Sequence, residues 1–280
     1  MRIAITGDRG YIGTDLEAQL RQSGPQAEIR GWDKIDGEDI TDPEVMKEIV
    51  EYKPDILYNL AGLSGEGACR KAGAVETEKI NVQAPARLRA DLGPRTLFVQ
   101  ASSASVLGLI GANVTPYAYS KWQAEQELKG FANTIICRFA TVFGFNRLQM
   151  RWDLALNLMC KTAVEEKVIR LEGPDRWRPW VSLRELTEVL KGFAVDWAAG
   201  SRFVSWGGPV PVAECNKTLL EMANLVAGAV PDAKVELLPA PSAGADMRNY
   251  SMPATLLWGS VRGEIWLLLE ELGVHNDPAI

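Results

Sequence analysis

The stretch RIAITGDRGYIGTDLEAQL, residues 2–20, contains the transition that decides the fold. Its first five residues after the initiator, 2–6, form a short, mostly apolar run that is typical of a buried strand and ends at a glycine. After the glycine-rich turn, Ile12, Leu16 and Leu20 recur at the spacing of one helical face. A strand, a glycine turn and an amphipathic helix in this order predict the first βα unit of a parallel sheet.

The same alternation continues through the first half of the chain. Further strands are expected at 27–33, 55–62, 96–102 and 133–144, and helices at 43–52, 74–92 and 120–130, with Pro85 interrupting the helical pattern of 74–92. Strands that alternate with helices form right-handed βαβ units. The predicted fold class is therefore α/β, a Rossmann-type doubly wound parallel sheet with helices on both faces.

The alternation weakens after about residue 145, where a helix is expected at 151–166, a short strand at 168–173 and another helix at 182–198. We expect residues 1–145 to form the first domain, with 178–206 returning to it. Residues 146–177 and 207–280 are expected to form a smaller, mostly C-terminal lobe.

Composition excludes several classes of function. The net charge of −6 provides no basic surface, so nucleic acid is not expected as a partner. The four cysteines are scattered without metal-ligand spacing, and a single histidine, His275, argues against histidine-based catalysis and against a metal site. The N-terminus lacks the apolar segment of a signal peptide, and no apolar run is long enough to span a membrane. A cytoplasmic protein without a membrane partner is expected.

Gly7, Gly10 and Gly13 lie between the first strand and the first helix. Glycines at these positions permit a tight turn and a close approach of backbone to a pyrophosphate group. The helix N-terminus that follows offers free N–H groups and the positive end of its dipole to the same phosphates. The turn is therefore predicted to bind a dinucleotide.

Asp33 closes the second strand, twenty residues after Gly13. A carboxylate there accepts hydrogen bonds from ribose hydroxyls and repels a 2′-phosphate, which favours NAD over NADP. Arg9 and Lys34 are close in sequence, and cations at those positions can accommodate a phosphate. NADP therefore remains the less favoured alternative.

The stretch TPYAYSKW, residues 115–122, contains two tyrosines and one lysine. Residues four apart share a helix face and residues two apart do not, so Lys121 pairs with Tyr117, and Tyr119 is expected to serve packing. Free tyrosine has a pKa of about 10 and is a poor base at neutral pH. A nearby cation stabilises the phenolate, so Lys121 is expected to depress the pKa of Tyr117.

The GxxGxxG spacing and the later Tyr-x-x-x-Lys pair resemble the extended short-chain dehydrogenase/reductases, specifically the NAD-dependent nucleotide-sugar epimerases and dehydratases. The resemblance covers nearly the whole chain. The stretches that carry it are 6–13, Asp33, 39–40, 55–62, 81–82, 101–108, 117–121, 138–144, 150–157, 176–186 and 246–250.

The resemblance implies a catalytic group of Tyr117, Lys121 and Ser103, with Ser102 and Ser105 as nearby alternatives to Ser103. In relatives, the residues that match Asp39 and Ile40 flank the adenine, and the one that matches Asn81 helps to hold the active-site strand. The residues implied at the cofactor are Gly7, Arg9, Gly10, Tyr11, Ile12, Gly13, Asp33, Asp39, Ile40, Leu60, Ala61, Gly62, Asn81, Ala101, Tyr117, Lys121, Phe139, Thr141 and Val142.

The smaller lobe would bind the nucleotide sugar. The resemblance implies that Asn157 faces the phosphates and that Arg178 and Arg248 bind the diphosphate. The substrate-binding residues implied are Ser64, Ser102, Asn157, Arg178 and Arg248. Relatives also dimerise through two helices per subunit, which implies a homodimer through 74–92 and 120–130.

The sequence departs from the family pattern after Ser103. Dehydratases carry an acidic pair where Ala104 and Ser105 stand, and only eight residues separate Gly108 from Tyr117. We therefore expect an NAD-dependent nucleotide-sugar epimerase that acts at C4 by transient oxidation of a hydroxyl and return of the hydride. The alternatives are a ketoreductase or dehydrogenase with net redox chemistry, and a cofactor-binding protein without turnover.

Overall fold

The structure is a computed structural model, and it describes residues 1–22, 27–109, 114–201, 208–239, 249–254 and 261–274. The backbone divides into two compact units. The first comprises residues 1–139 and 187–210, and the second comprises residues 140–186 and 211–280. The domain boundaries expected from the sequence concern which residues hold cofactor and which hold substrate, and they stay a prediction.

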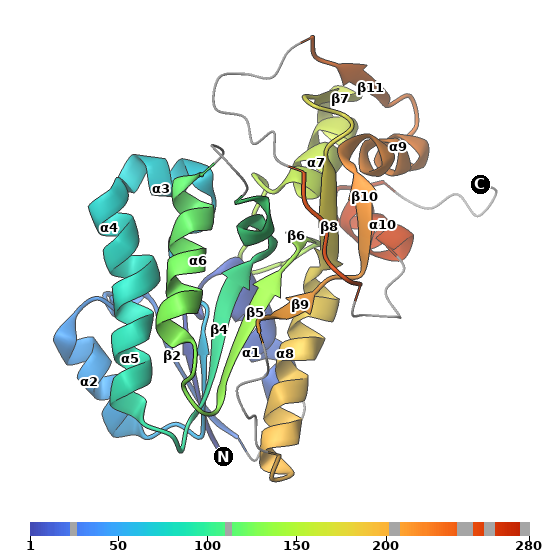
Figure 1. Ribbon diagram of the computed structural model, residues 1–280. Helices are drawn as coiled ribbons and strands as arrows, with labels where there is room; N and C mark the ends of the chain where they lie inside the picture. Colours follow the sequence, from blue (N-terminus) through green and yellow to red (C-terminus); the bar gives the residue numbers. More distant parts are fainter. Residues whose placement is uncertain (23–26, 110–113, 202–207, 240–248, 255–260, 275–280) are drawn as a thin grey trace. The chain divides into compact units, whose positions relative to one another are not determined.

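The first unit is built on a central sheet of strand order β2-β1-β3-β4-β5-β9 (Figure 1). Neighbouring strands from β2 to β5 pair in parallel, which confirms the predicted α/β, Rossmann-type fold class. The order reverses at β1, the kind of switch point where ligands bind beyond the carboxyl ends of the strands. The strands are β1 (Arg2–Thr6), β2 (Glu28–Trp32), β3 (Ile56–Asn59), β4 (Leu97–Ser103), β5 (Thr134–Phe139) and β9 (Val210–Val212).

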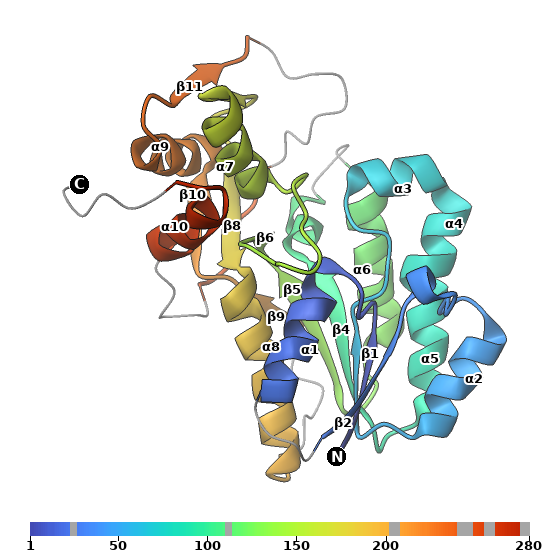
Figure 2. The ribbon, with the colours of Figure 1, turned by 180° about the vertical axis from the view of Figure 1, so that it is seen from behind.

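Helices cover both faces of this sheet, so its central strands are buried on both sides. On one face, Ala4, Leu57 and Phe98 pack against Ile49 and Leu88. The helices of that face are α2 (Pro43–Tyr52), α3 (Glu66–Ala72), α4 (Ala74–Glu78), α5 (Ala84–Leu92) and α6 (Pro116–Leu128). Figures 1 and 2 show α1 (Tyr11–Gln22) and α8 (Leu183–Ala198) on the opposite face.

The helix α6 corrects the predicted range of 120–130. It begins four residues earlier, at Pro116, and ends at Leu128. Proline suits the first helical position because its missing N–H has no intrahelical partner there and its φ is already helical. The earlier start places Tyr117 inside the first turn, so Tyr117 and Lys121 lie on one helix, one turn apart.

The predicted helix 74–92 is helical throughout, although Pro85 lies in it. Between α4 and α5 the chain forms a π-helical turn, Lys79–Gln83, in which the Ala84 N–H donates to the Lys79 carbonyl five residues back. In a regular α-helix the ring of Pro85 would clash with the carbonyl four residues earlier. The wider turn removes that clash, and it contains Asn81.

The second unit contains a three-stranded sheet of order β10-β8-β6 and a two-stranded parallel sheet of β11 and β7. Its core includes Leu156, Trp180, Met222 and Leu268. The elements are β6 (Thr141–Phe143), α7 (Ala155–Glu166), β7 (Val168–Leu171), β8 (Trp177–Ser182), β10 (Cys215–Thr218), α9 (Leu219–Ala229), β11 (Lys234–Leu237) and α10 (Val261–Glu271).

The described residues contain neither a membrane-spanning helix nor a group of side chains that could hold a metal. None of their helices is long and apolar enough to cross a membrane. None of their His, Cys, Asp and Glu side chains gather in a group of three that could hold a metal ion.

Candidate active site

The glycine turn between β1 and α1 is tightly packed, and two of its glycines have no room for a side chain. Gly7 has a φ of +76°, and a Cβ on it would lie 2.7 Å from the Ala61 nitrogen. A Cβ on Gly13 would lie 2.1 Å from the Gly7 carbonyl oxygen. The close approach of Gly7, Gly13 and Ala61 therefore requires residues without side chains at both glycines. Binding of a dinucleotide pyrophosphate at this turn stays a prediction, and a tight glycine turn at a helix N-terminus is the geometry it needs.

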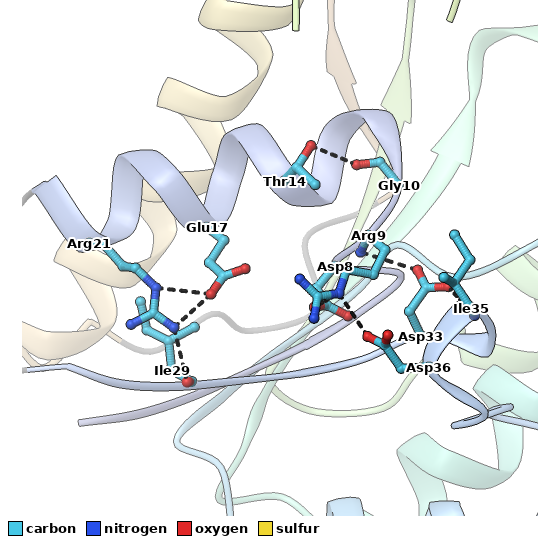
Figure 3. Close-up of polar contacts among 10 residues, drawn as sticks. All are labelled: Asp8, Arg9, Gly10, Thr14, Glu17, Arg21, Ile29, Asp33, Ile35 and Asp36. Carbon is cyan, nitrogen blue, oxygen red and sulfur yellow. Dashed lines mark hydrogen bonds and ion pairs between the residues drawn. The ribbon is translucent and has the colours of Figure 1, made fainter. Parts of the chain in front are cut away.

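The residues next to this turn contribute to it differently. Tyr11 is buried and Ile12 is half-buried in the first turn of α1. Gly10 accepts a hydrogen bond from the Thr14 hydroxyl at 2.9 Å (Figure 3). Tyr11 therefore belongs to the core of the unit, and the Thr14 hydroxyl fixes the Gly10 carbonyl at the start of α1.

Asp33 lies where β2 ends, facing the glycine turn. Its Oδ2 accepts a hydrogen bond from the Arg9 backbone N–H at 3.2 Å, and its Oδ1 accepts one from the Ile35 N–H at 2.9 Å (Figure 3). The side chain therefore caps the 3-10 turn Lys34–Asp36 and joins β2 to the glycine turn. This is the place at which a carboxylate can meet the ribose hydroxyls of a bound dinucleotide.

The two cations considered beside Asp33, Arg9 and Lys34, both form ion pairs with carboxylates. Arg9 Nε lies 2.7 Å from Asp36 Oδ2 (Figure 3), and Lys34 Nζ lies 2.7 Å from Asp39 Oδ2. Burial acts to raise the pKa of Asp39, but hydrogen bonds from Lys34 and Thr41 outweigh it, so this pKa lies below its ordinary value. The charges of Arg9 and Lys34 are thus already balanced within the chain.

Ile40, predicted beside the adenine, is 5% exposed and packs in the core with Trp32, Val45 and Met46. A core side chain stabilises the fold and offers little surface to a ligand. Asp39 is half-buried and its carboxylate is occupied as described. The Ile40 side chain thus belongs to the core, and the place of both residues beside the adenine stays a prediction.

Asp8 was not singled out by the sequence, although it lies inside the glycine turn. It is 6% exposed, and a Cβ on Gly31 would lie 2.2 Å from its carboxylate. Its Oδ1 has no hydrogen-bond partner among the described residues. Burial raises its pKa to about 6, against the lowering effect of Arg9. A glycine in the middle of a strand signals such a close approach, and Gly31 is the feature that could have revealed it.

A row of buried polar side chains crosses the three central strands. The Thr6 hydroxyl donates to Asn59 Oδ1 at 2.6 Å, and Asn59 Nδ2 donates to Gln100 Oε1 at 2.8 Å. Gln100 Nε2 donates in turn to the Ala101 carbonyl at 3.0 Å. These residues end apolar runs, which is the signal that sequence reasoning passed over. The row ties β1, which leads into the glycine turn, to β4, the strand that ends at Ser103.

Lys121 reaches the same carbonyl from the helix side. Its Nζ donates to Ala101 O at 3.1 Å and lies 6.0 Å from the centre of the Tyr117 ring. The side chain is 6% exposed, and burial lowers its pKa to about 8. No carboxylate forms an ion pair with it in the described part of the chain.

The carboxylate nearest along the helix, that of Glu125, is engaged elsewhere. Arg138 donates to both of its oxygens, at 2.8 and 2.6 Å, and the Ser102 hydroxyl donates to Oε1 at 2.6 Å. Ser102 is therefore buried against Glu125 and has no hydroxyl proton left for a substrate. Its predicted role in substrate binding is not supported, because alternate residues of a strand face opposite sides of the sheet.

The Tyr117 phenol lies within hydrogen-bonding reach of the Ser103 and Ser64 hydroxyls. Ser105 donates to Ser103 Oγ at 3.0 Å, so of the three serines considered it is Ser103 that lies between its neighbour and the phenol. Burial raises the pKa of Tyr117, and the two serine hydroxyls act to lower it. The shift is opposite to the predicted one, because loss of water around the phenolate, with the nearby Cys69 and Glu66, outweighs the two serine hydroxyls.

Asn81 holds the segment that follows β3. Its Oδ1 accepts the Leu63 N–H at 2.8 Å, and its Nδ2 donates to the Leu63 carbonyl at 3.1 Å and to the Ser120 hydroxyl at 3.0 Å. The expectation that it steadies the active-site strand is thus corrected. It steadies the 62–64 loop against α6, from the π-helical turn.

The other predicted cofactor residues of the first unit lie close to this group. Leu60 and Ala61 follow β3 and are half-buried, Gly62 is exposed, and Ala101 supplies the carbonyl already described. Phe139 ends β5 and is 6% exposed. The structure therefore gathers the three predicted catalytic residues and most predicted cofactor residues of this unit at the carboxyl edge of its sheet.

The remaining predicted residues belong to the second unit. Thr141 and Val142 lie in β6. Asn157 is fully buried, and its amide accepts from the Gly144 N–H and donates to the Arg151 carbonyl, both at 3.0 Å. These bonds hold the 144–151 loop, so the prediction that Asn157 faces phosphates is not supported.

Arg178 is also internal to the second unit. It is 6% exposed, its Nη1 donates to the Trp177 carbonyl at 2.7 Å, and its guanidinium lies 4.4 Å above the Tyr250 ring. This arrangement orders the start of β8, and it does not show the open fork that a diphosphate needs. Arg248, the second predicted diphosphate ligand, lies outside the described residues.

Comparison with known proteins adds three findings. The sequence profile described as the NAD dependent epimerase/dehydratase family matches residues 3–195. A search of curated protein sequences finds none that matches. Solved structures match over almost the full chain at low sequence identity, and these likenesses show the fold.

Three of these structures illustrate the range of matches. An NAD-dependent NDP-hexosamine 5,6-dehydratase, TunA, is 18% identical over the whole of both chains, with a TM-score of 0.77. The UDP-glucose 4-epimerase of Thermotoga maritima, solved with UDP-glucose, is 14% identical over 98% of this chain and 99% of its own, with a TM-score of 0.78. RMD from Pseudomonas aeruginosa, solved with NADPH, is 16% identical over 96% and 98%, with a TM-score of 0.74.

Proposed function

The chain belongs to the NAD-dependent epimerase/dehydratase family, and from this premise we propose that it is a nucleotide-sugar epimerase, with Tyr117 as the base. The observation that carries the proposal is the assembly of Ser103, Tyr117 and Lys121 in the unit that also contains the tightly packed glycine turn. A protein that only bound a dinucleotide would have no need of a buried, unpaired lysine beside a phenol.

In the proposed reaction, Tyr117 takes the proton of a sugar hydroxyl, at C4, while the hydrogen on that carbon leaves as hydride. The nicotinamide, when bound, accepts the hydride and adds a positive charge near the phenol. Ser103 and Ser64 donate hydrogen bonds toward the phenolate, and the Lys121 charge stabilises it. Tyr117 then returns the proton when the ketone is reduced on its other face, so the chain finishes each turnover unchanged.

The residues after Ser103 favour epimerisation over dehydration. Elimination of water from a sugar needs a group that delivers a proton to the leaving hydroxyl. Ala104 offers none, and Ser105 is buried with its hydroxyl on Ser103. A net ketoreductase remains the second candidate, because the same group of residues serves any exchange of hydride at a carbinol carbon.

NAD is the proposed cofactor, in preference to NADP. Asp33 presents a carboxylate beside the glycine turn, and the two neighbouring cations are each balanced by a carboxylate 2.7 Å away. A 2′-phosphate would meet Asp33 without a free cation to offset the repulsion. Ribose hydroxyls would instead donate to it.

We also propose a cytoplasmic homodimer that forms through the α4–α5 segment and α6. The support is an aromatic pair on the outer face of α6. Tyr119 and Trp122 are 43% and 39% exposed, and their rings stack with centroids 5.6 Å apart. Exposed aromatic pairs of this kind are common at the centre of interfaces.

The test is a thermal-shift screen of nucleotide sugars with NAD present, followed by determination of the product's configuration for each hit. Epimerisation predicts a C4 epimer without a net change in absorbance of the reduced nicotinamide. A stoichiometric change in that absorbance would replace the epimerase with the ketoreductase. Absence of a shift with every nucleotide sugar would contradict the substrate class.

A further inference from the structure

The helix that carries the catalytic tyrosine is capped by a side chain from another helix. Thr115 stands at the N-cap of α6, yet its side chain makes no hydrogen bond to an N–H of that helix. Its hydroxyl donates to Glu66 Oε1, and the Tyr117 backbone N–H donates to Glu66 Oε2 at 3.1 Å. One carboxylate therefore satisfies the N–H of Tyr117 itself.

Glu66 is the first residue of α3 and lies about fifty positions before its partners in sequence. It follows Gly65, whose φ of +91° turns the chain into α3. Two residues earlier, Ser64 reaches the Tyr117 phenol. The span Ser64–Glu66 thus contacts both ends of Tyr117, the hydroxyl through Ser64 and the backbone through Glu66.

We propose that Glu66 is a positioning residue for Tyr117, fixing the first turn of α6, and with it the phenol, from the loop that follows β3. This role rests on the proposed function of Tyr117 as the base. Backbone N–H groups at a helix start have no intrahelical partners, and a carboxylate there also meets the positive end of the dipole. Asn81 holds the 62–64 loop against α6, and Glu66 follows two residues after this loop, at the start of α3.

The charge of Glu66 has a second effect on the same tyrosine. The groups that face the phenol are Glu66 and Cys69 from α3, the Ser64 and Ser103 hydroxyls, and Lys121 from α6. Glu66 acts to raise the pKa of Tyr117, because a nearby negative charge disfavours the phenolate. Replacing the carboxylate with a neutral group therefore lowers this pKa and makes the base available at lower pH.

Three variants separate the two effects. Glu66→Gln keeps an oxygen for the Tyr117 N–H and an amide for Thr115, but it removes the charge. Glu66→Ala removes both the hydrogen bonds and the charge. Thr115→Ala is the matched control, because it removes one Glu66 contact and leaves the bond to the Tyr117 N–H.

The first readout is hydrogen exchange of the Tyr117 amide in the full chain, with and without NAD. Loss of the cap in Glu66→Ala should speed this exchange about tenfold, while Thr115→Ala leaves it within about twofold of the parent. The second readout is the pH dependence of kcat with the nucleotide sugar found in the screen. Glu66→Gln should move the acidic limb to lower pH with the thermal midpoint unchanged, and Glu66→Ala should lower kcat with little change in KM.

Unchanged exchange at Tyr117 in Glu66→Ala would overturn the proposed role, as would an acidic limb that stays in place in Glu66→Gln. The exchange measurement needs no substrate. If no nucleotide sugar is turned over, the proposed function fails while faster exchange still shows that Glu66 positions Tyr117. If Tyr117→Phe is inactive but the Glu66 variants match the parent in both readouts, the proposed function stands and the positioning role fails.

Discussion

The cations at the carboxyl edge of the first unit's sheet differ in burial and in ion pairing. Arg9 and Lys34, near the end of β2, are exposed and each lies 2.7 Å from a carboxylate. Lys121, on α6, is 6% exposed and its Nζ contacts the Ala101 carbonyl. The exposed pairs cost little because water screens them. The buried lysine destabilises the fold, and its charge remains available to the phenol.

The carboxylate that would neutralise Lys121 is present but occupied. Glu125 lies one helical turn further along α6, and Arg138 and Ser102 hold both of its oxygens. Had Glu125 paired with Lys121, the charge would be balanced as it is at Arg9. The comparison therefore supports the proposed chemistry at Lys121, whose charge forms no ion pair among the described residues.

The largest expected effect comes from removing that charge. Lys121→Met should lower kcat by about 10²- to 10⁴-fold, because the phenolate of Tyr117 loses its nearest cation. Lys129→Met, on the exposed end of the same helix, is the matched control and should leave kcat within about twofold. Steady-state kinetics with the nucleotide sugar identified by the screen measure both, and equal rates for the two variants would break the comparison.

The same variant should be more stable than the parent at neutral pH. The pKa of Lys121 falls from 10.5 to about 8 on folding, so burial of its charge costs about 3 kcal/mol below pH 8. The lost hydrogen bond to Ala101 offsets about 1 kcal/mol of the gain. As pH rises from 8 toward 10.5 the parent releases this proton when it folds, and its stability rises.

Urea unfolding of parent and Lys121→Met at pH 7 and pH 10 tests this. The stability advantage of the variant should be about 2 kcal/mol at pH 7 and should shrink at pH 10. An advantage that is equal at both values would mean that Lys121 carries no charge penalty in the folded chain.

A smaller effect is expected where the cations are balanced. Asp36→Asn removes the carboxylate 2.7 Å from Arg9 and leaves its guanidinium with the more distant carboxylate of Asp8, 3.7 Å away. The ratio of NADP to NAD affinity should then rise by about tenfold, since a guanidinium fork binds a phosphate well. Asp91→Asn, which breaks a similar exposed pair with Arg87 on α5, serves as the control.

Titration of NAD and NADP binding by quenching of tryptophan fluorescence measures the ratio. A ratio in Asp36→Asn that equals the one in Asp91→Asn would show that Arg9 does not face the 2′ position. The ion pair of Arg9 would then not explain a preference for NAD.

The smallest expected effect concerns Asp8. Its pKa is raised from 3.8 to about 6, so the charged form is disfavoured in the folded chain. The stability it contributes is complete below about pH 4 and is lost as pH rises through 6. Asp8→Asn should therefore be more stable than the parent by about 1 kcal/mol at pH 7.5, allowing for screening, and equal to it at pH 4. Thermal midpoints at the two pH values check this, and a midpoint lowered at pH 7.5 would contradict it.

The features that were predicted correctly from the sequence are local ones. Apolar runs, glycine spacing and the four-residue separation of Tyr117 and Lys121 each express a backbone period, so they could be read before the fold was known. The start of α6 was misplaced because Pro116 was not taken as the first helical residue, although proline suits that position.

The features that were missed or misassigned depend on partners far along the chain. Ser102 and Ser103 are adjacent, but only the sheet decides that Ser102 meets Glu125 and Ser103 meets Tyr117. Asn157 and Arg178 carry the right chemistry for phosphates, yet both contact the backbone of their own unit. Residue type alone cannot distinguish a ligand-binding group from an internal one.

The sequence by itself determined the alternation of strands and helices, the glycine turn, and the pairing of one tyrosine with one lysine, since each follows from spacing within twenty residues. The partner of each carboxylate is set by the tertiary structure. It assigned Asp36 to Arg9, Glu125 to Arg138 and Glu66 to the backbone of Tyr117. The reason is physical, because Coulomb energies and burial depend on distances in space, and those distances are set by elements that lie far apart in the chain.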